Sequence, residues 1–208
     1  MLEALDELRQ RPIRLVVLLI CALVAIAHQA TRWGWFIDDA AICFAYARNV
    51  AQLEGVVPWP GAERIEGISD PLWVALLAVL YRLGLDGFEI AEPLGMLFGV
   101  INLGLAWRLA RAALPDHEGE GALIAPILLA INAQFAIWSA SGLENGLFCL
   151  LLSVAILRTL QEVRGGGWPL ASLCYLLLAW TRPEGIGYAA LGGLWFALWT
   201  LRQGRGLR

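Results

Sequence analysis

The chain has 208 residues, of which 59% are hydrophobic and 16% charged, and its formal charge is −3. Soluble domains carry about 25% charged residues, and a soluble helical bundle needs polar helix faces that this chain lacks, so the composition favours an integral membrane protein. No basic patch indicates nucleic acid as a partner. The four cysteines are scattered, without the spacing of a disulfide framework or a zinc site, and we expect them to be packing residues.

The first apolar run extends from Leu15 to Ala30 and is predicted to be a membrane span. Residues 1–14 mix acids with three arginines, and no small-residue cleavage site follows the run, so we interpret it as a retained span and not as a signal peptide. Arginines beside the first span favour a cytoplasmic N-terminus. After an aromatic rim, two adjacent carboxylates follow, Asp38 and Asp39, which we place on the opposite, external face.

Residues 39–53 are predicted to form an amphipathic helix that lies in the membrane interface. Ile42, Tyr46, Val50 and Leu53 recur at helical spacing, and the polar residues fall away from this stripe. A turn-rich segment with several Gly and Pro residues follows. We therefore treat residues 38–70 as the first external loop.

Six more apolar runs follow this loop, and they are Pro71–Leu85, Ala91–Ala113, Ala122–Ser139, Leu147–Leu157, Trp168–Thr181 and Gly185–Leu201. The sequence therefore predicts an all-α integral membrane protein, a single transmembrane module over residues 1–208, with about seven apolar helices plus the interfacial helix.

The topology of the second to fourth runs stays open at this point. If every run crosses the bilayer, the Ser-Gly-Leu-Glu-Asn-Gly segment at residues 141–146 lies on the face opposite Asp38. If one of these runs is re-entrant or only half-spanning, the two segments share a face. Arg108 and Arg111, near the end of the third run, favour the shared face because basic residues mark the inner side.

Asp38 and Asp39 are the first candidate catalytic residues. Asp is a common helix N-cap, and a second acid in the first turn suits the helix dipole, which accounts for one of the two carboxylates. The other then remains at the membrane surface, available as a general base that takes a proton from a hydroxyl group.

Arginines in the same loop suggest an anion site. Arg48 lies on the polar face of the predicted helix, and Arg64 lies in the loop beyond it with Glu66 close by. Guanidinium groups suit phosphate oxygens. A solvated loop that contacts lipid headgroups accounts for the same residues without any site.

Two short polar segments separate later apolar runs. Glu144 lies in the first, and Arg182 and Glu184 flank a proline in the second. A polar hinge and a tight turn are the plain interpretation. The functional one places these residues in the same cavity, since an ionisable residue between spans is costly unless it is paired or wet. If Asp38, Asp39 and Glu144 converge, they could also hold Mg²⁺, Mn²⁺ or Ca²⁺.

Residues 37–73 resemble the first-loop signature of bacterial GT-C membrane glycosyltransferases, close to the arabinofuranosyltransferase-like and mannosyltransferase-like members, and they read IDDAAICFAYARNVAQLEGVVPWPGAERIEGISDPLW. The Ser-Gly-Leu-Glu-Asn-Gly and Thr-Arg-Pro-Glu-Gly segments resemble two further segments of that family, in the same order. Asn145 stands where Thr is usual in the family, and Asp70 stands where Asn or Ser is usual.

The resemblance implies an inverting transfer of a sugar from a polyprenyl-phosphate donor to a cell-envelope glycan or lipid acceptor. It places the reaction on the external, periplasmic face of the bacterial cytoplasmic membrane. It also implies that Asp38 is the catalytic base, with Asp39 as the next candidate. The residues implied in donor and acceptor binding are Arg48, Arg64, Glu66, Glu144, Arg182 and Glu184.

Two other hypotheses remain beside this one. Transferases of this kind usually have further spans, so we expect the chain to be the N-terminal part of a longer enzyme, or else a truncated, non-catalytic membrane module that binds a lipid phosphate or a partner subunit. A transporter is favoured less, because no pair of interrupted apolar segments suggests inverted repeats around a midplane site.

Overall fold

The computed structural model describes residues 12–114, 120–165 and 168–202, and within these ranges it contains nine α-helices and one short 3₁₀ helix. The all-α prediction is therefore confirmed. The elements in chain order are α2 (Pro12–Ala30), α3 (Asp38–Ala51), α4 (Pro71–Arg82), α5 (Gly87–Ala113), η1 (Gly121–Leu123), α6 (Ile124–Ala130), α7 (Ala133–Ser139), α8 (Asn145–Gly165), α9 (Leu170–Thr181) and α10 (Glu184–Arg202).

The prediction of seven spanning helices is wrong. In the described part of the chain, three helices are long and apolar enough to cross a membrane, namely α2, α5 and α8. A fourth crossing arises if α6 and α7, which are bent by 62° against each other, count as one broken span. Together these helices indicate a multi-pass membrane protein.

The excess in the prediction comes from short helices that were counted as crossings. α4 and α9 have 12 residues each, and at 1.5 Å per residue such a helix reaches about 18 Å, well short of a hydrocarbon core of about 30 Å. α10 has 19 residues, but it begins at Glu184 and ends at Arg202, and it is not among the helices that are apolar enough over a full crossing. The break in the fourth run falls at Asn132, whose side chain accepts a hydrogen bond from the Phe135 N–H and so begins α7 anew.

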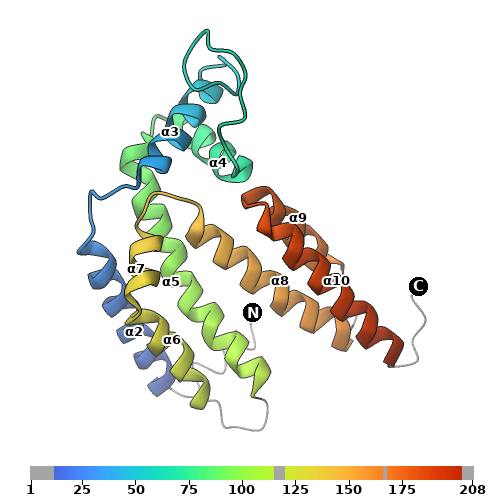
Figure 1. Ribbon diagram of the computed structural model, residues 1–208. Coiled ribbons are helices and arrows are strands. Elements are labelled where there is room, and N and C mark those ends of the chain that lie inside the picture. Colours follow the sequence, from blue (N-terminus) through green and yellow to red (C-terminus); the bar gives the residue numbers. More distant parts are fainter. Residues whose placement is uncertain (1–11, 115–119, 166–167, 203–208) are drawn as a thin grey trace.

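α3 and α4 form a cap at one end of the longer helices (Figure 1). α3 begins one residue before its predicted start and ends two residues before its predicted end. Its buried face differs from the predicted apolar stripe, since Ile42 and Leu53 are exposed. The face that packs against Trp73 and Leu77 of α4 is formed by Ala40, Cys43, Phe44, Tyr46 and Ala47.

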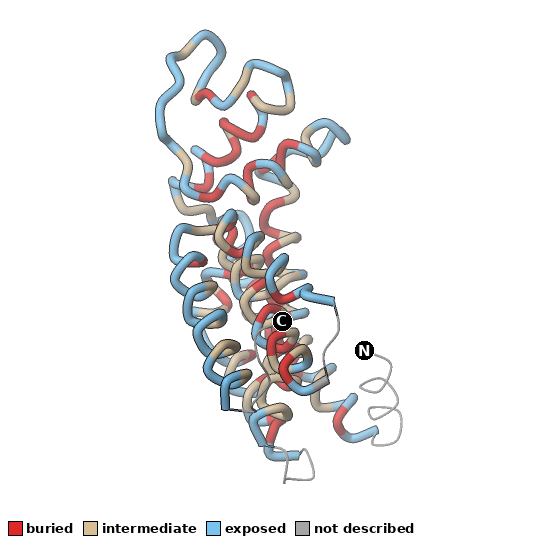
Figure 2. The backbone as a smooth tube through the Cα atoms, turned by 90° about the vertical axis from the view of Figure 1, so that its right-hand side faces the viewer, coloured by how far each residue is buried: buried red, intermediate tan, exposed pale blue. Residues whose placement is uncertain are grey.

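The long helices expose many apolar side chains. On α2 these include Leu19, Ile20 and Leu23, while Cys21 and Ala25 face α5 and α6. Figure 2 shows that buried residues follow the inner sides of the helices and that exposed residues follow their outer sides. A helix with an apolar outer surface matches a lipid environment.

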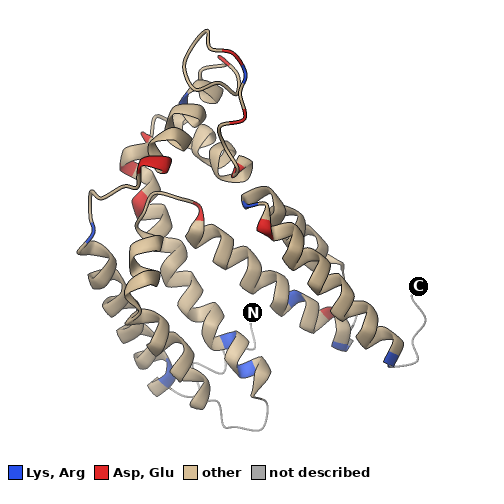
Figure 3. Ribbon diagram, viewed as in Figure 1, with Lys and Arg blue, Asp and Glu red and all other residues tan. Residues whose placement is uncertain are grey.

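Charged residues are distributed unevenly along the long axis of the molecule. Most acidic residues lie toward the α3–α4 end, while arginines mark the opposite ends of α5, α8 and α10 (Figure 3). The two ends of the helical bundle therefore differ in charge, with the acidic end covered by the cap.

Candidate functional site

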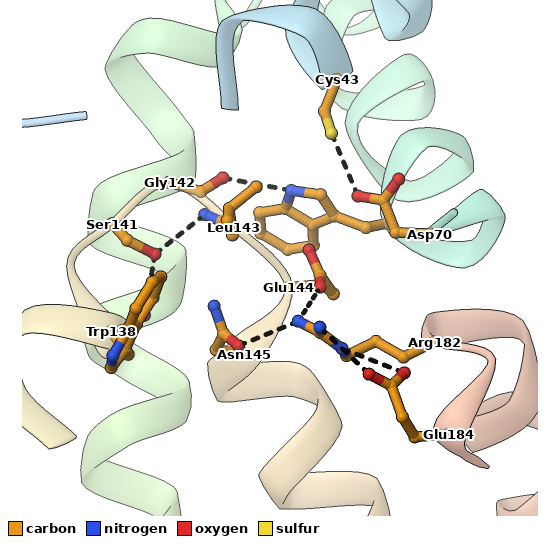
Figure 4. A network of polar contacts seen from close by, with 11 residues as sticks. Cys43, Asp70, Trp138, Ser141, Gly142, Leu143, Glu144, Asn145, Arg182 and Glu184 are labelled. Carbon is orange, nitrogen blue, oxygen red and sulfur yellow. Dashed lines mark hydrogen bonds and ion pairs between the residues drawn. The ribbon is translucent and has the colours of Figure 1, made fainter. Parts of the chain in front are cut away.

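A cavity of about 510 Å³ lies where the cap meets the ends of the long helices. Its walls come from four segments that are far apart in the sequence: the start of α3, the residues before α4, the α7–α8 loop and the α9–α10 turn. The charged and thiol side chains that line it are Asp39, Cys43, Asp70, Glu144 and Arg182. Figure 4 shows the last four of these. We call this cavity the acidic pocket.

The α7–α8 loop positions Glu144. Gly142 has φ +83°, and a Cβ at this position would lie 2.7 Å from a ring carbon of Phe36, so only glycine fits the loop without a shift. The Trp73 indole N–H donates to the Gly142 carbonyl at 3.2 Å, and Ser141 Oγ accepts from the Leu143 N–H at 3.3 Å. These bonds fix the loop so that Glu144 points into the pocket and is only 5% exposed.

Arg182 pairs with Glu144 across the pocket floor. Its Nη1 donates to Glu144 Oε1 at 2.8 Å and to Asn145 Oδ1 at 3.2 Å, and its Nη2 donates to Glu184 Oε1 at 3.4 Å. The Arg182 side chain is 34% exposed and that of Glu144 is 6% exposed. One guanidinium therefore serves two carboxylates, a buried one inside the pocket and an exposed one at its edge.

Asp70 occupies the N-cap position of α4, but its side chain does not cap this helix. Its Oδ2 accepts a hydrogen bond from the Cys43 thiol at 3.1 Å, while its Oδ1, also buried, has no hydrogen-bond partner among the described residues. Burial, followed by the charge of Asp70, raises the pKa of Cys43 far above its usual range. The thiol therefore stays protonated as a donor to Asp70 and is not a nucleophile.

The charges and the burial of the pocket change the pKa of Glu144. The pKa of Glu144 is raised to about 7, mainly by burial. The charge of Asp70 contributes to this rise, whereas a backbone hydrogen bond and the charge of Arg182 oppose it. Among the described residues that line the pocket, Arg182 is the single cation beside the three acids Asp39, Asp70 and Glu144. Glu144 can therefore exchange a proton near neutral pH, a property that suits acid–base chemistry.

The two adjacent aspartates differ in their placement. Both lie in the first turn of α3, where their charges suit the helix dipole, and Ile37 holds the N-cap position. Asp39 lines the acidic pocket, while Asp38 is exposed and lies outside the described lining. Of the two candidates for the base, Asp39, which is also exposed, belongs to the pocket lining together with Asp70 and Glu144.

Three further predicted site residues are not part of the described pocket lining. Arg48 is exposed on α3, and Arg64 and Glu66 are exposed in the loop between α3 and α4, outside the described lining. Glu184 reaches the pocket only through its contact with Arg182. The predicted grouping of Arg48 and Arg64 with the acidic residues at one site is not seen.

Asp70 and Cys43 are pocket residues that were not among the candidates. The signal for Asp70 was present in the sequence, as an acid directly before Pro71, but an acid before a helix normally suggests a cap. Nothing in the local pattern around Cys43 distinguishes it from a packing residue. Among the described residues, no group of three or more His, Cys, Asp or Glu side chains is arranged to hold a metal ion, so Asp38, Asp39 and Glu144 do not form such a site there.

Comparison with protein-family models, with curated proteins and with solved structures finds no match for this chain.

Proposed function

We propose that the chain is the membrane module of a GT-C-type glycosyltransferase, which transfers a sugar with inversion from a polyprenyl-phosphate donor to a cell-envelope glycan or lipid. The observation that carries the proposal is the convergence of Asp39, Glu144 and Arg182 on one pocket at the end of an apolar helical bundle. These residues come from the three segments that resemble the family, which lie far apart in the sequence.

The pocket offers the groups that such a transfer needs. The carboxylate of Asp39 accepts the proton of the acceptor hydroxyl, while the oxygen of that hydroxyl attacks the anomeric carbon of the donor sugar. The bond between that carbon and the phosphate oxygen breaks, and the phosphate leaves with the electron pair. A guanidinium on the floor, Arg182, compensates the charge of the leaving phosphate.

The location follows from the same arrangement. Arginines at the bundle end opposite the pocket favour that end as the cytoplasmic one, under the positive-inside rule. The acidic pocket then opens on the external face of a bacterial cytoplasmic membrane, where a polyprenyl chain lies in the bilayer and its phosphate reaches the pocket.

The experiment compares Asp39→Asn with Asp38→Asn in membranes supplied with a lipid-linked sugar and an acceptor. If Asp39 is the base, its substitution lowers the transfer rate by roughly 10²–10⁴-fold, whereas Asp38→Asn keeps most of the rate, because Asp38 lies outside the described pocket lining. Full activity in Asp39→Asn would remove this mechanism, and absence of transfer by the unmodified protein would remove the proposed function.

A further inference from the structure

The carboxylates of the acidic pocket would repel a phosphate. Three carboxylates and one guanidinium line its described walls, and the guanidinium of Arg182 already pairs with Glu144 at 2.8 Å and with Glu184 at 3.4 Å. An anion that approaches Arg182 meets Glu144, whose carboxylate lies 2.8 Å from the guanidinium, in a pocket that Asp70 and Asp39 also line. In a partly buried site such repulsion is weakly screened, so the anion binds only if the negative charge of the pocket falls.

The buried oxygen Asp70 Oδ1 indicates where a proton can reduce the negative charge of the pocket. Asp70 is 3% exposed, and this oxygen has no hydrogen-bond partner among the described residues. A buried acceptor without a donor is costly. Helix capping does not explain its position, since the side chain of Asp70 makes no cap bond to α4 and instead accepts from the Cys43 thiol (Figure 4). Asp70 lines the pocket together with Glu144.

A proton on Glu144 would remove both difficulties. The protonated carboxyl can donate to the carboxylate of Asp70, with which Glu144 already interacts, and it no longer holds Arg182 as an ion pair. The other charged or titratable groups around it keep their roles. Cys43 from α3 donates to Asp70 Oδ2, Asp39 lies at the rim, and Glu184 of α10 holds Arg182 from outside.

We propose that the acidic pocket binds a phosphate diester at Arg182 and takes up one proton as it does so, with the proton held between Glu144 and Asp70. Glu144 thereby acts as the counter-ion of Arg182 in the free pocket and releases it when the anion arrives. The inference rests on the proposed function in so far as the anion is the phosphate of a lipid-linked sugar.

The direction of the pH dependence follows because anion binding at Arg182 is linked to protonation of Glu144. The pKa of Glu144 in the free pocket is raised to about 7, and an anion on Arg182 raises it further, because it removes the opposing positive charge. Below pH 7 the pocket is already protonated and affinity is constant. Above pH 7 each bound anion must bring in a proton, so affinity falls by up to about tenfold per pH unit.

The test uses methyl farnesyl phosphate, a prenyl phosphodiester with one acidic group, which stays ionised from about pH 5 to about pH 9. Calorimetric titration of the detergent-solubilised protein gives the affinity at about pH 6 and about pH 9. Repeating it in buffers of different ionisation enthalpy gives the protons taken up. We expect at least about tenfold weaker binding at the higher pH, with net proton uptake on binding above pH 7.

Single substitutions distinguish the roles of the individual side chains in anion binding and proton uptake. Glu144→Gln is expected to bind with little pH dependence and without proton uptake, and Asp70→Asn is expected to reduce the uptake. Glu184→Gln is the matched control, because Glu184 also contacts Arg182 but is exposed, so this variant keeps the pH dependence. Arg182→Gln is expected to lose binding.

The proposal is overturned if the unmodified protein binds the probe with equal affinity at both pH values, or if Glu144→Gln retains the dependence. Failure of the inference and failure of the proposed function are distinguishable. Sugar transfer without proton-linked binding would support the proposed transferase function and contradict the inference of proton uptake. Proton-linked binding without transfer would keep the anion site and favour a non-catalytic module.

Discussion

Glu144 and Arg182 are the residues on which the acidic pocket depends most. The carboxylate is buried and the guanidinium is the single described cation among the lining residues. A buried ion pair adds little to stability compared with a pair of apolar residues, but loss of one partner leaves an uncompensated charge. The stability of this region is therefore expected to depend on both partners being present.

Arg182→Gln is expected to destabilise the protein by about 2–3 kcal/mol at pH 8. Breaking a buried pair costs about 3–5 kcal/mol, and the value is lower here because Arg182 is one-third exposed. Arg158→Gln is the control, since Arg158 has similar exposure and its contact with Glu162 is longer, at 3.7 Å, and lies along one helix, so we expect a smaller loss. Denaturation in detergent measures both, and equal losses would contradict the assignment.

Glu144→Gln is expected to flatten the pH dependence of stability between pH 4.5 and about 7. The folded protein raises the pKa of Glu144 from 4.5 to about 7, so the folded state binds the proton more tightly than the unfolded state. The favourable contribution is complete below pH 4.5 and is lost as pH rises through 7, by an amount on the order of 3 kcal/mol. Melting temperatures across this range test it, and a variant with the same slope as the unmodified protein would refute it.

At the scale of elements, α5 holds the bundle together through small residues on one face. Gly95 lies against the backbone carbonyl of Ser139 at the end of α7, and Gly99 lies under the side chain of Gln29 of α2. The close approach of α5 and α7 carries the following loop, and with it Glu144, to the pocket. A contact between α5 and α7 thus contributes to the geometry of a site that neither helix lines with its own charged residues.

Gly95→Ala is expected to destabilise the protein, because the added Cβ would overlap the Ser139 carbonyl, which is backbone and cannot rotate away. Overpacking of this kind costs about 1–3 kcal/mol. Gly104→Ala on the same helix is the control, since no described atom lies within 4 Å of its added Cβ, and it should stabilise by about 0.5–1 kcal/mol. Thermal unfolding in detergent compares the two, and similar effects would contradict the packing argument.

At the scale of the whole molecule, the short helices decide which segments share an end. α4 turns back after 12 residues, and the α6–α7 pair is bent. The first loop, the α7–α8 loop and the α9–α10 turn therefore meet at one end of the bundle, around the acidic pocket. Of the two topologies that the sequence left open, this arrangement matches the one in which Asp39 and Glu144 share a face.

Cysteine labelling tests that arrangement in a membrane. In a background without the four native cysteines, Glu63→Cys and Glu184→Cys are expected to react with an impermeant thiol reagent from the same side. Gln161→Cys, near the far end of α8, should react only from the other side. Labelling of the first two positions from opposite sides would show that α4 or the α6–α7 pair crosses the bilayer completely.

Features of composition and short-range pattern were determined by the sequence alone. The apolar runs specify helices and a membrane environment, because each residue in them prefers burial or lipid whatever its neighbours are. The polar segments around Glu144 and Arg182 were predictable for the same reason, since a charge between apolar runs marks an end.

Only the tertiary structure decided which of these residues meet. It places Asp39 and not Asp38 at the pocket, brings in Asp70 and Cys43, and leaves Arg48 and Arg64 outside. Helical periodicity predicted the buried stripe of α3 only in part, since Tyr46 and Val50 pack against the core whereas Ile42 and Leu53 are exposed. The buried face is set by its contact with α4. Local preferences fix where a helix begins and which environment it tolerates, whereas convergence depends on contacts between segments that are distant in the sequence.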